Sequence, residues 1–448
     1  MSRARDVAYA CVMSASTEGA YANLIMPTLL RKAGLDGRDA GFATELAYGA
    51  LRMRGLYDAI IAHASRRDPR DLDPELRVAL WLGAHQALAM RVPPHAAVNE
   101  TVDQVRRERG AGAAKLANAV MRRVTERDAE QWMSVVASGT GRDAMAVRHS
   151  HPAWVVEELE RALAEDGRAG EISALLDADN SPARVTLVAR PGLVDRDELA
   201  HEAGGEAGEY SPYAVVMSGG RPGDLRSVAD GTAAVQDEGS QVVAAALASV
   251  REVEPGERWL DMCAGPGGKA ALLGALAAEH GAFLEALELH PHRAELVRGS
   301  IKAVPDGTVT VRVADATDFG EDGAYDRIVL DAPCSGLGAL RRRPESRWRR
   351  QPDDLEELVP LQRALLANAE RLLAPGGVLA YITCSPVVAE TRDVVAGSAL
   401  RQLDAREAVA RVTGTTARMW GSGPHVQLWT HVHGTDAMFL ALLGKPAS

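Results

Sequence analysis

Apolar residues recur at spacings of three and four from Arg5 to about Arg127, a pattern that predicts a series of helices. Turn signals interrupt it at Gly34-Leu-Asp-Gly37, Asp68-Pro69 and Val92-Pro-Pro94. Later, Ala183-Arg-Val-Thr-Leu-Val-Ala189 alternates with a period of two, which predicts a strand. We therefore expect an all-helical domain over residues 1–140 and a small α/β linker domain over residues 145–240.

After Trp259 the pattern changes to short apolar runs separated by helical segments. The predicted strands are Ala282 to Leu289, Val309 to Val313, Tyr325 to Leu330 and Gly377 to Thr383. Parallel neighbours need crossover connections, which are usually helices. We therefore predict that residues 241–446 form an α/β domain with a Rossmann-like, doubly wound sheet.

Composition and charge narrow the class of protein. The chain has 448 residues, of which 46% are hydrophobic and 25% charged, as in a multidomain globular protein. The sequence contains no apolar run of membrane-spanning length, and its first residues lack the apolar core of a secretory signal, so we expect a cytoplasmic protein. The net charge of −11 argues against indiscriminate coating of nucleic acid. The four cysteines are far apart and lack zinc-site spacing, so we expect reduced thiols and no metal.

A glycine-rich turn follows a further predicted strand near Trp259, which is the first strand of the third domain. It reads Leu260-Asp-Met-Cys-Ala-Gly-Pro-Gly-Gly-Lys-Ala270. Gly265, Gly267 and Gly268 lack a Cβ, so a ligand can approach the backbone, and free amides at a helix start favour an anion. A tight strand-to-helix connection without a ligand has the same spacing, so the turn alone leaves both interpretations open.

Acidic residues lie where later strands of this domain are predicted to end. Glu288 ends the second strand, and Asp315 and Asp331 follow subsequent ones. Such strand ends line the ligand crevice of an open α/β sheet, although solvated acids also occur there. An acid at the tip of the second strand suits a ribose diol, in a dinucleotide enzyme as well as in other nucleoside-binding proteins.

Two cysteines end apolar strands at the same predicted sheet edge. Cys334 closes Asp331-Ala-Pro-Cys, and Cys384 lies in Tyr381-Ile-Thr-Cys-Ser. A lone cysteine at a strand end is usually an inert, buried small residue, which is our interpretation of the side chain of Cys263. Because Cys334 and Cys384 share an edge with the acids, we interpret them as reactive thiols.

With these residues in place, the chain resembles the RsmB (Fmu/Sun) family of ribosomal RNA 5-methylcytosine methyltransferases over essentially its whole length. The motifs that carry the resemblance are Asp261-Met-Cys-Ala-Gly-Pro-Gly-Gly-Lys269, Asp331-Ala-Pro-Cys-Ser-Gly336, Thr383-Cys-Ser385 and Val235-Gln-Asp-Glu-Gly-Ser-Gln241. The resemblance implies a class I methyltransferase domain with S-adenosyl-L-methionine as cofactor. It also implies methylation of carbon 5 of a cytosine in RNA through a covalent cysteine–cytosine adduct.

The resemblance also assigns roles to residues. It implies that Cys384 is the nucleophile, that Cys334 is needed to release the product, and that Asp331 contacts the cytosine. In the related DNA cytosine-5 enzymes the Pro-Cys cysteine attacks, so the opposite assignment of the two thiols stays open. The cofactor-binding residues that the resemblance implies are Asp261, Cys263, Ala264, Gly265, Pro266, Gly267, Gly268, Lys269, Glu288, Arg293, Asp315 and Asp331.

The helical first domain resembles NusB, an RNA-binding antitermination factor, through Gly19-Ala-Tyr-Ala-Asn23, Phe42-Ala-Thr-Glu-Leu-Ala-Tyr-Gly49 and Val92-Pro-Pro-His-Ala-Ala-Val-Asn-Glu100. Relatives that act on transfer RNA often lack such a domain, so the fusion favours a 16S ribosomal RNA substrate, free or in an assembling small subunit. We expect a monomer with no membrane partner. The alternatives are the same chemistry on transfer RNA, and an RNA-binding assembly factor without turnover.

Three features depart from the family pattern. Gly265 stands where Ala is usual, Glu288 stands where Asp is usual, and Asp436-Ala-Met-Phe439 replaces Asp-Gly-Phe-Phe. None of these removes a reacting group, so we expect an effect on cofactor affinity more than on activity.

Arginines cluster after the Cys334 loop. The segment Arg341-Arg-Arg-Pro-Glu-Ser-Arg-Trp-Arg-Arg350 holds six arginines in ten residues. We predict that it contacts RNA phosphates and that Trp348 stacks on a base. The sequence does not decide whether the arginines of the first domain form a second patch. These arginines are Arg3, Arg5, Arg52, Arg54, Arg122 and Arg123.

Overall fold

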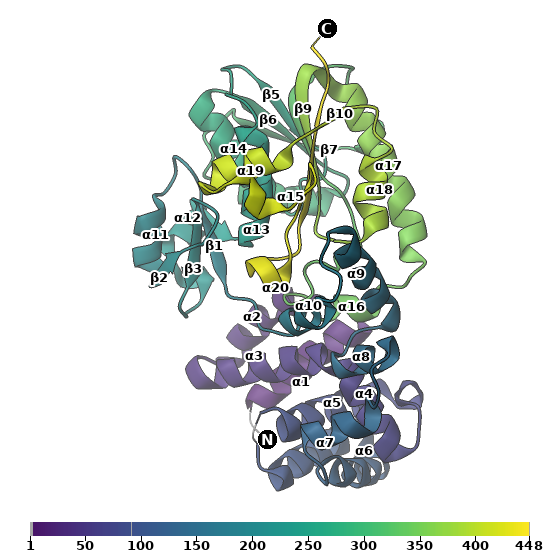
Figure 1. Ribbon diagram of the computed structural model, residues 1–448. Coiled ribbons are helices and arrows are strands. Elements are labelled where there is room, and N and C mark those ends of the chain that lie inside the picture. The colour runs from purple at the N-terminus through teal and green to yellow at the C-terminus, as the bar shows by residue number, and fades with distance from the viewer. Residues whose placement is uncertain (1–2, 91, 448) are drawn as a thin grey trace. The chain divides into compact units, whose positions relative to one another are not determined.

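The computed structural model describes residues 3–90 and 92–447, which fall into two compact units (Figure 1). One unit comprises Met1–Glu160, Gly170–Pro182 and Leu340–Arg350. The other comprises Arg161–Ala169, Ala183–Ala339 and Gln351–Ser448. Among the described residues, no helix is both long enough and apolar enough to cross a membrane.

The first unit is helical, as predicted. Its helices are α1 (Arg3–Thr17), α2 (Ala22–Ala33), α3 (Gly37–Arg52), α4 (Arg54–Ser65), α5 (Pro74–Leu88), α6 (Pro94–Val124), α7 (Ala129–Val136), α8 (Arg142–Arg148), most of α9 (Ala153–Glu165), α10 (Ile172–Asp179), the short α16 (Ser346–Arg349), and the 3-10 turn η1 (Pro69–Asp71).

The predicted breaks coincide with helix ends. Gly34 ends α2 in the left-handed region at φ 61°, which glycine adopts without steric cost. Asp68 caps η1 through its side chain, and Pro94 is the first residue of α6. The apolar faces pack into one core that includes the fully buried side chains of Trp81 and Trp132.

A small antiparallel sheet forms in the second unit, with strand order β2-β3-β1-β4. Its elements are β1 (Thr186–Ala189), α11 (Arg196–Ala203), β2 (Gly205–Ala207), β3 (Ala214–Met217), η2 (Pro222–Asp224), α12 (Arg226–Asp230) and β4 (Ala233–Val235). β1 confirms the strand predicted from its alternation. Leu187 pairs with Val215 on one side and with Val235 on the other.

The larger sheet has the order β10-β12-β9-β8-β5-β6-β7, and β11 pairs with β12. Its strands are β5 (Arg258–Asp261), β6 (Phe283–Glu288), β7 (Val309–Val313), β8 (Tyr325–Asp331), β9 (Leu373–Thr383), β10 (Arg401–Leu403), β11 (Val426–Gln427) and β12 (Phe439–Gly444). Along the sheet from β9 through β8, β5 and β6 to β7, neighbouring strands are parallel, as predicted. β12 is antiparallel to β9, so the complete sheet is mixed.

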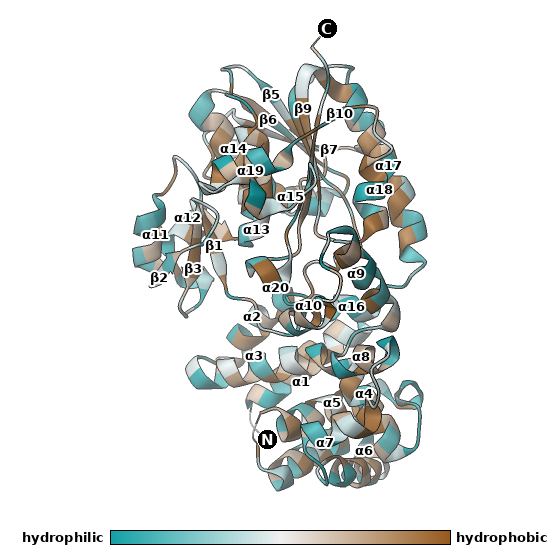
Figure 2. Ribbon diagram, in the orientation of Figure 1, coloured by the Kyte–Doolittle hydropathy of each residue, from teal (hydrophilic) through white to brown (hydrophobic). Residues whose placement is uncertain are grey.

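Helices cover both faces of this sheet (Figure 1). The helices and turns of the domain are α13 (Glu238–Ser249), α14 (Gly268–His280), α15 (Pro291–Ser300), α17 (Asp354–Leu372), η3 (Val388–Glu390), α18 (Arg392–Val395), α19 (Ala405–Thr413), η4 (Ala417–Trp420) and α20 (Thr430–His433). Side chains of β9 alternate between the two faces: Ala380 and Ile382 pack with α13, α14 and α19, whereas Leu379 and Tyr381 pack with α17. Figure 2 shows hydrophobic colour along the central strands.

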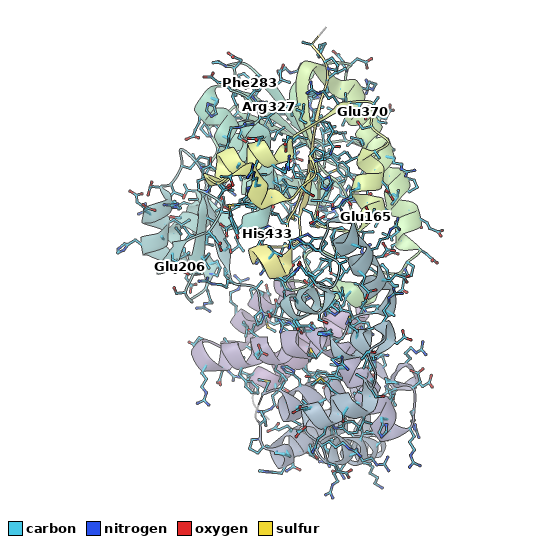
Figure 3. All side chains as sticks on the ribbon, viewed as in Figure 1. Glu165, Glu206, Phe283, Arg327, Glu370 and His433 are labelled. Carbon is cyan, nitrogen blue, oxygen red and sulfur yellow. The ribbon has the colours of Figure 1, made fainter. Side chains whose placement is uncertain are left out.

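A buried arginine fixes α13 to the amino end of β8. Arg327 (labelled in Figure 3) is fully buried, and its guanidinium donates to the carbonyl oxygens of Leu247 at 2.8 Å and Glu252 at 2.9 Å. These carbonyls lie at and beyond the end of α13, where backbone acceptors lack helical partners. Arg327 also donates to Glu257 at 2.7 Å, which neutralises the buried charge.

Candidate active site

The two cysteines that the sequence singles out lie side by side. β8 and β9 are parallel neighbours in which Asp331 pairs with Ile382, so the loops after them leave the same sheet edge. The Sγ atoms of Cys334 and Cys384 are 3.4 Å apart. Their hydrogen bond and burial raise the pKa of Cys334 well above its ordinary range. The two thiols therefore contact each other directly, and either sulfur can be the hydrogen-bond donor.

A lysine–aspartate pair lies beside the thiols. Lys269, in the first turn of α14, donates to Asp331 Oδ2 at 2.8 Å. Burial lowers the pKa of Lys269, but the charges of Asp331 and Cys384 outweigh it, and the net pKa is raised. An ammonium group close to Cys384 stabilises the thiolate form of that cysteine.

Asp261, at the end of β5, is a buried carboxyl group among other acids. Burial and the charge of Asp331 raise its pKa to about 7. Its Oδ1 accepts the backbone N–H of Cys263 at 3.2 Å, whereas its Oδ2 is buried and has no hydrogen-bond partner. Such an orphaned acceptor points to a donor supplied by a ligand.

Glu288 and Arg293 join the second strand to the glycine-rich turn. Glu288 is 4% exposed, and its Oε1 accepts the N–H of His290 at 3.0 Å. Arg293 lies 3.4 Å from Glu288 Oε2 and donates to the carbonyl oxygen of Gly265 at 2.8 Å. The structure thus brings together these three predicted cofactor-binding residues.

The rest of the turn leads into α14. Ala264 donates its N–H to the carbonyl oxygen of Leu287 at 2.8 Å, and Ser300 donates to the carbonyl oxygen of Pro266 at 3.0 Å. Gly267 has φ 112°, a conformation that side chains disfavour, and it caps α14 directly before Gly268. This arrangement places free backbone N–H groups at the helix start.

Asp315 and Cys263 differ from the other predicted site residues. Asp315 is exposed and lies two residues beyond β7, where its Oδ1 accepts both donors of Thr317 at 2.9 and 2.7 Å; these bonds lower its pKa. Burial, with the charge of Asp261, raises the pKa of Cys263 well above its ordinary range. A thiol held protonated in this way fits the interpretation of Cys263 as unreactive.

Comparison with known proteins identifies the family. Residues 248–444 match the family described as 16S rRNA methyltransferase RsmB/F, and residues 2–126 match the NusB family. A protein of Mycobacterium tuberculosis with the name "Putative methyltransferase" is 46% identical over 99% of this chain and 96% of its own length. The ribosomal RNA small subunit methyltransferase B of Pseudomonas putida is 32% identical over 95% of this chain and 94% of its own length. The chain belongs to the RsmB/F methyltransferase family.

Solved structures share the fold. The crystal structure of PH0851 aligns with a TM-score of 0.81 at 21% identity over 99% of this chain and 98% of its own. NSun6 from Pyrococcus horikoshii, solved with SFG, aligns with a TM-score of 0.51 at 19% identity over 65% of this chain and 98% of its own.

The cofactor of this RsmB/F methyltransferase is S-adenosylmethionine, and the residues present fit it. The buried Oδ2 of Asp261 can accept an ammonium group, and the free N–H groups at the start of α14 can bind a carboxylate. Glu288, at the end of the second strand, can accept a ribose diol.

Two further polar residues near the site were not predicted from the sequence. Gln236 lies in the Val235–Gln241 motif, and a Cβ on Gly268 would be 3.9 Å from its side-chain amide. Its Oε1 is buried without a hydrogen-bond partner. Glu390 lies five residues after Ser385 and is fully buried. The glutamine could have been found from its motif, but nothing in the sequence marks Glu390.

The prediction that the arginine-rich segment contacts RNA phosphates is wrong for Arg347, whereas the half-buried Trp348 stays a predicted stacking surface. Residues 340–350 belong to the helical unit. Arg347 is fully buried and donates to the Ser150 carbonyl at 3.1 Å and to Asn180 Oδ1 at 2.8 Å. The Trp348 ring packs so closely against Gly55 that a Cβ there would lie 2.6 Å from its Cζ2 atom.

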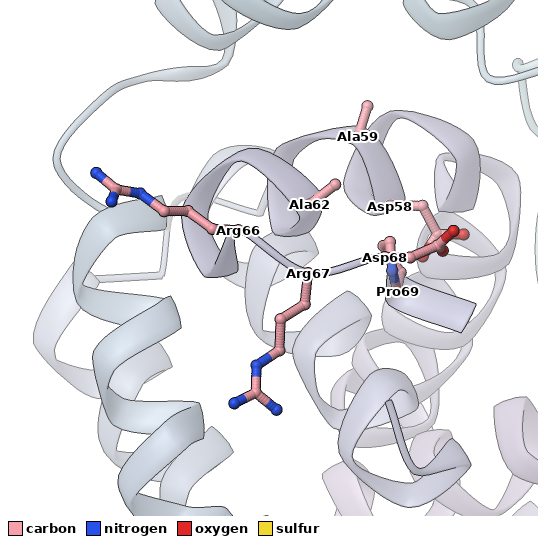
Figure 4. A pocket seen from close by; sticks show the side chains of 7 residues that line it. All are labelled: Asp58, Ala59, Ala62, Arg66, Arg67, Asp68 and Pro69. Carbon is pink, nitrogen blue, oxygen red and sulfur yellow. The ribbon is translucent and has the colours of Figure 1, made fainter. Parts of the chain in front are cut away.

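Some arginines of the first domain also make contacts within the helical unit. Arg52 is buried, and the Arg54 guanidinium lies 4.7 Å from the centroid of Trp81. A shallow hollow of about 480 Å³ lies at the end of α4 in the same unit (Figure 4). Arg66 and Arg67 line it but point away from one another, so they do not converge on one anion.

Proposed function

We propose that this enzyme methylates carbon 5 of a cytosine in 16S ribosomal RNA through a covalent adduct with Cys384. The observation that carries the proposal is the pair of thiols, 3.4 Å apart, beside the ion pair of Lys269 and Asp331. Carbon 5 of cytosine is a poor nucleophile, and a thiol pair beside a methyl donor suits the covalent route that overcomes this.

In the proposed reaction the Cys384 thiolate bonds to carbon 6 of the ring, and the displaced electron pair makes carbon 5 nucleophilic. S-adenosylmethionine supplies the electrophilic methyl group when bound. Ring nitrogen 3 takes up a proton as charge develops, and the hydrogen-bonded pair of Asp331 and Lys269 can donate it. A base then takes the proton from carbon 5, nitrogen 3 returns its own, and the bond from Cys384 breaks.

The two cysteines divide these roles by their surroundings. Cys384 lies near the Lys269 ammonium, which favours its thiolate, whereas the hydrogen bond with Cys384 and burial raise the pKa of Cys334. We therefore assign attack to Cys384 and the release step to Cys334. The target base must leave any stack to reach the thiol, so we expect an unpaired or flipped cytosine.

The direct test measures transfer of labelled methyl from S-adenosylmethionine to unmodified 16S ribosomal RNA and, separately, to transfer RNA, followed by nucleoside analysis. Label in 5-methylcytosine from the ribosomal sample supports the proposal. Label from transfer RNA alone overturns the substrate but keeps the chemistry. If assembling small subunits and both RNAs remain unlabelled while the cofactor binds, the protein acts as an assembly factor.

A further inference from the structure

A buried carboxylate accepts hydrogen bonds from the residues that directly follow the two cysteines. Glu390, in η3, is 0% exposed. Its Oε1 accepts the backbone N–H of Ser335 at 2.7 Å and the Gln362 amide at 3.2 Å. Its Oε2 accepts the hydroxyls of Ser335 at 2.5 Å and Ser385 at 2.6 Å. All four donors are neutral, so the carboxylate is held by hydrogen bonds from uncharged groups.

The two serines directly follow the two cysteines. Ser335 comes after Cys334 in the loop that follows β8, and Ser385 comes after Cys384 at the end of β9. Their Oγ atoms are 3.0 Å apart, one residue beyond the thiols. A single carboxylate therefore ties together the two loops that carry the reactive sulfur atoms.

Further hydrogen bonds hold the loop that carries Cys334. Gln362, from α17, also donates to the carbonyl oxygen of Pro333 at 2.8 Å, directly before Cys334. Gly338 donates its N–H to the carbonyl oxygen of Cys384 at 2.9 Å. The Cys334 loop is thus held on both sides of its thiol, and each of these contacts uses a neutral donor.

The choice of a carboxylate has a chemical reason. Each serine hydroxyl has one proton, and both protons can point to Oε2 only if that atom is a pure acceptor. An amide at this position would present its NH2 group either to the two hydroxyls or to the N–H donors of Ser335 and Gln362, so it could not accept all four hydrogen bonds. Burying a carboxylate costs free energy unless it is well hydrogen-bonded, so an apolar residue would be the cheaper way to fill this space.

We propose that Glu390 is a positioning residue that sets the distance between the Cys334 and Cys384 thiols. The inference rests on the proposed function, in which the two sulfur atoms act on one cytosine. Glu390 itself does not touch the substrate, because its side chain is fully buried. It acts through Ser335 and Ser385.

The first test measures thiol distance without any methyl transfer. Diamide oxidises two neighbouring thiols to a disulfide, taking up their two protons and two electrons, and peptide mass spectrometry follows the Cys334–Cys384 product. We expect Glu390→Gln to slow this cross-link about tenfold, because an amide cannot accept all four of the hydrogen bonds that Glu390 accepts. Glu370→Gln is the matched control: Glu370 (labelled on α17 in Figure 3) accepts the Ser398 hydroxyl at 2.5 Å elsewhere in the domain. Equal rates in wild type and Glu390→Gln would overturn the proposal.

The second test separates positioning from general support of the fold. We expect Glu390→Gln to lower the single-turnover rate of methyl transfer about tenfold, with the Kd for S-adenosylmethionine and the melting temperature unchanged. A matching loss of cofactor binding and melting temperature would show a merely structural role and overturn the proposal. Should Glu390→Gln fail to fold, Ser385→Ala replaces it, since it removes the hydroxyl that joins Glu390 to the Cys384 loop, together with the acceptor of the Val387 N–H, and the same outcomes apply.

The two tests also distinguish this inference from the proposed function. A wild-type enzyme that methylates no cytosine, but whose cross-linking rate depends on Glu390, would refute the function and keep the positioning role. An enzyme that methylates cytosine equally well with Gln at position 390, and cross-links equally fast, would refute the positioning role alone.

Discussion

Gly265 faces the carboxylate of Glu288 so closely that a Cβ at position 265 would overlap Glu288 Oε2 and lie 3.0 Å from its Cδ. The carboxylate has little room to move, because it is 4% exposed and contacts both His290 and Arg293. The two residues of the cofactor site that depart from the pattern implied by the family resemblance therefore lie against each other. The longer acid occupies the space that a methyl group on residue 265 would fill.

Gly265→Ala is expected to weaken S-adenosylmethionine binding about tenfold, and Glu288→Asp in the same chain should restore part of that loss. The overlap costs about 1–3 kcal/mol if the neighbours must shift, and shortening the acid relieves it. Isothermal titration calorimetry on the four chains of the double-mutant cycle measures the coupling. Gly299→Ala is the control, since a Cβ on that exposed helical residue meets nothing within 4 Å. Strictly additive effects would contradict the pairing.

The sequence predicted the parallel part of the catalytic sheet because helical crossovers separate its apolar strands. It did not predict β12, whose antiparallel pairing with β9 needs no crossover and leaves no such pattern. Phe439 to Gly444 form an interior strand between β9 and β10, and only tertiary pairing defines it.

In the candidate site, too, local features were predicted and features that depend on distant residues were not. Residues within continuous motifs, such as Asp331 and Cys334, were predicted because their spacing relative to a strand is local. Glu390 was not predicted, because its hydrogen-bond partner Ser335 is 55 residues away in the sequence. The prediction of RNA contact for Arg347 failed because a local run of charged residues does not indicate which of them the tertiary structure buries.

The raised pKa of Asp261 predicts a pH-dependent stability of the cofactor-free protein. The folded pKa is about 7, against about 3.9 in an unfolded chain, so between these values the folded state binds a proton that the unfolded state lacks. Stability should therefore fall as the pH rises from about 4 to about 7, by at most about 4 kcal/mol, and level off above that range. Denaturant titrations at a series of pH values measure this.

Asp261→Asn should remove most of that fall, because an amide stays neutral. Asp326→Asn serves as the control; Asp326 lies at the other end of β8, where its carboxylate accepts the backbone N–H of Arg258 at 2.8 Å. An Asp261→Asn protein with the wild-type pH dependence would show that other groups cause it.

Arg347→Gln is expected to destabilise the helical unit by about 3 kcal/mol, because it removes a buried guanidinium and leaves its acceptors without a donor. Burial lowers the pKa of Arg347 to about 9, in keeping with a side chain that water does not reach. Arg343→Gln is the matched control in the same segment, because Arg343 is exposed. Thermal unfolding and the salt dependence of RNA affinity are measured for both; an unchanged melting temperature with weaker RNA binding in Arg347→Gln would restore the phosphate-contact role.

The division of labour between the thiols predicts opposite outcomes for two alanine variants. Cys384→Ala should abolish methyl transfer and form no covalent complex, because no sulfur bonds to carbon 6. Cys334→Ala should accumulate a protein–RNA adduct that survives denaturation, because the adduct forms but the Cys384 bond is not released. Denaturing gels with end-labelled RNA detect the adduct, and nucleoside analysis measures the methyl product.

Cys11→Ala is the control for loss of a thiol, since Cys11 is fully buried in the helical unit and should leave turnover unchanged. An adduct in Cys384→Ala, with none in Cys334→Ala, would reverse the assignment and make the Pro-Cys cysteine the nucleophile. Full turnover in Cys384→Ala would exclude that residue from the chemistry. Because the two sulfur atoms are only 3.4 Å apart, their positions alone do not assign the attack, and this pair of variants separates attack from release.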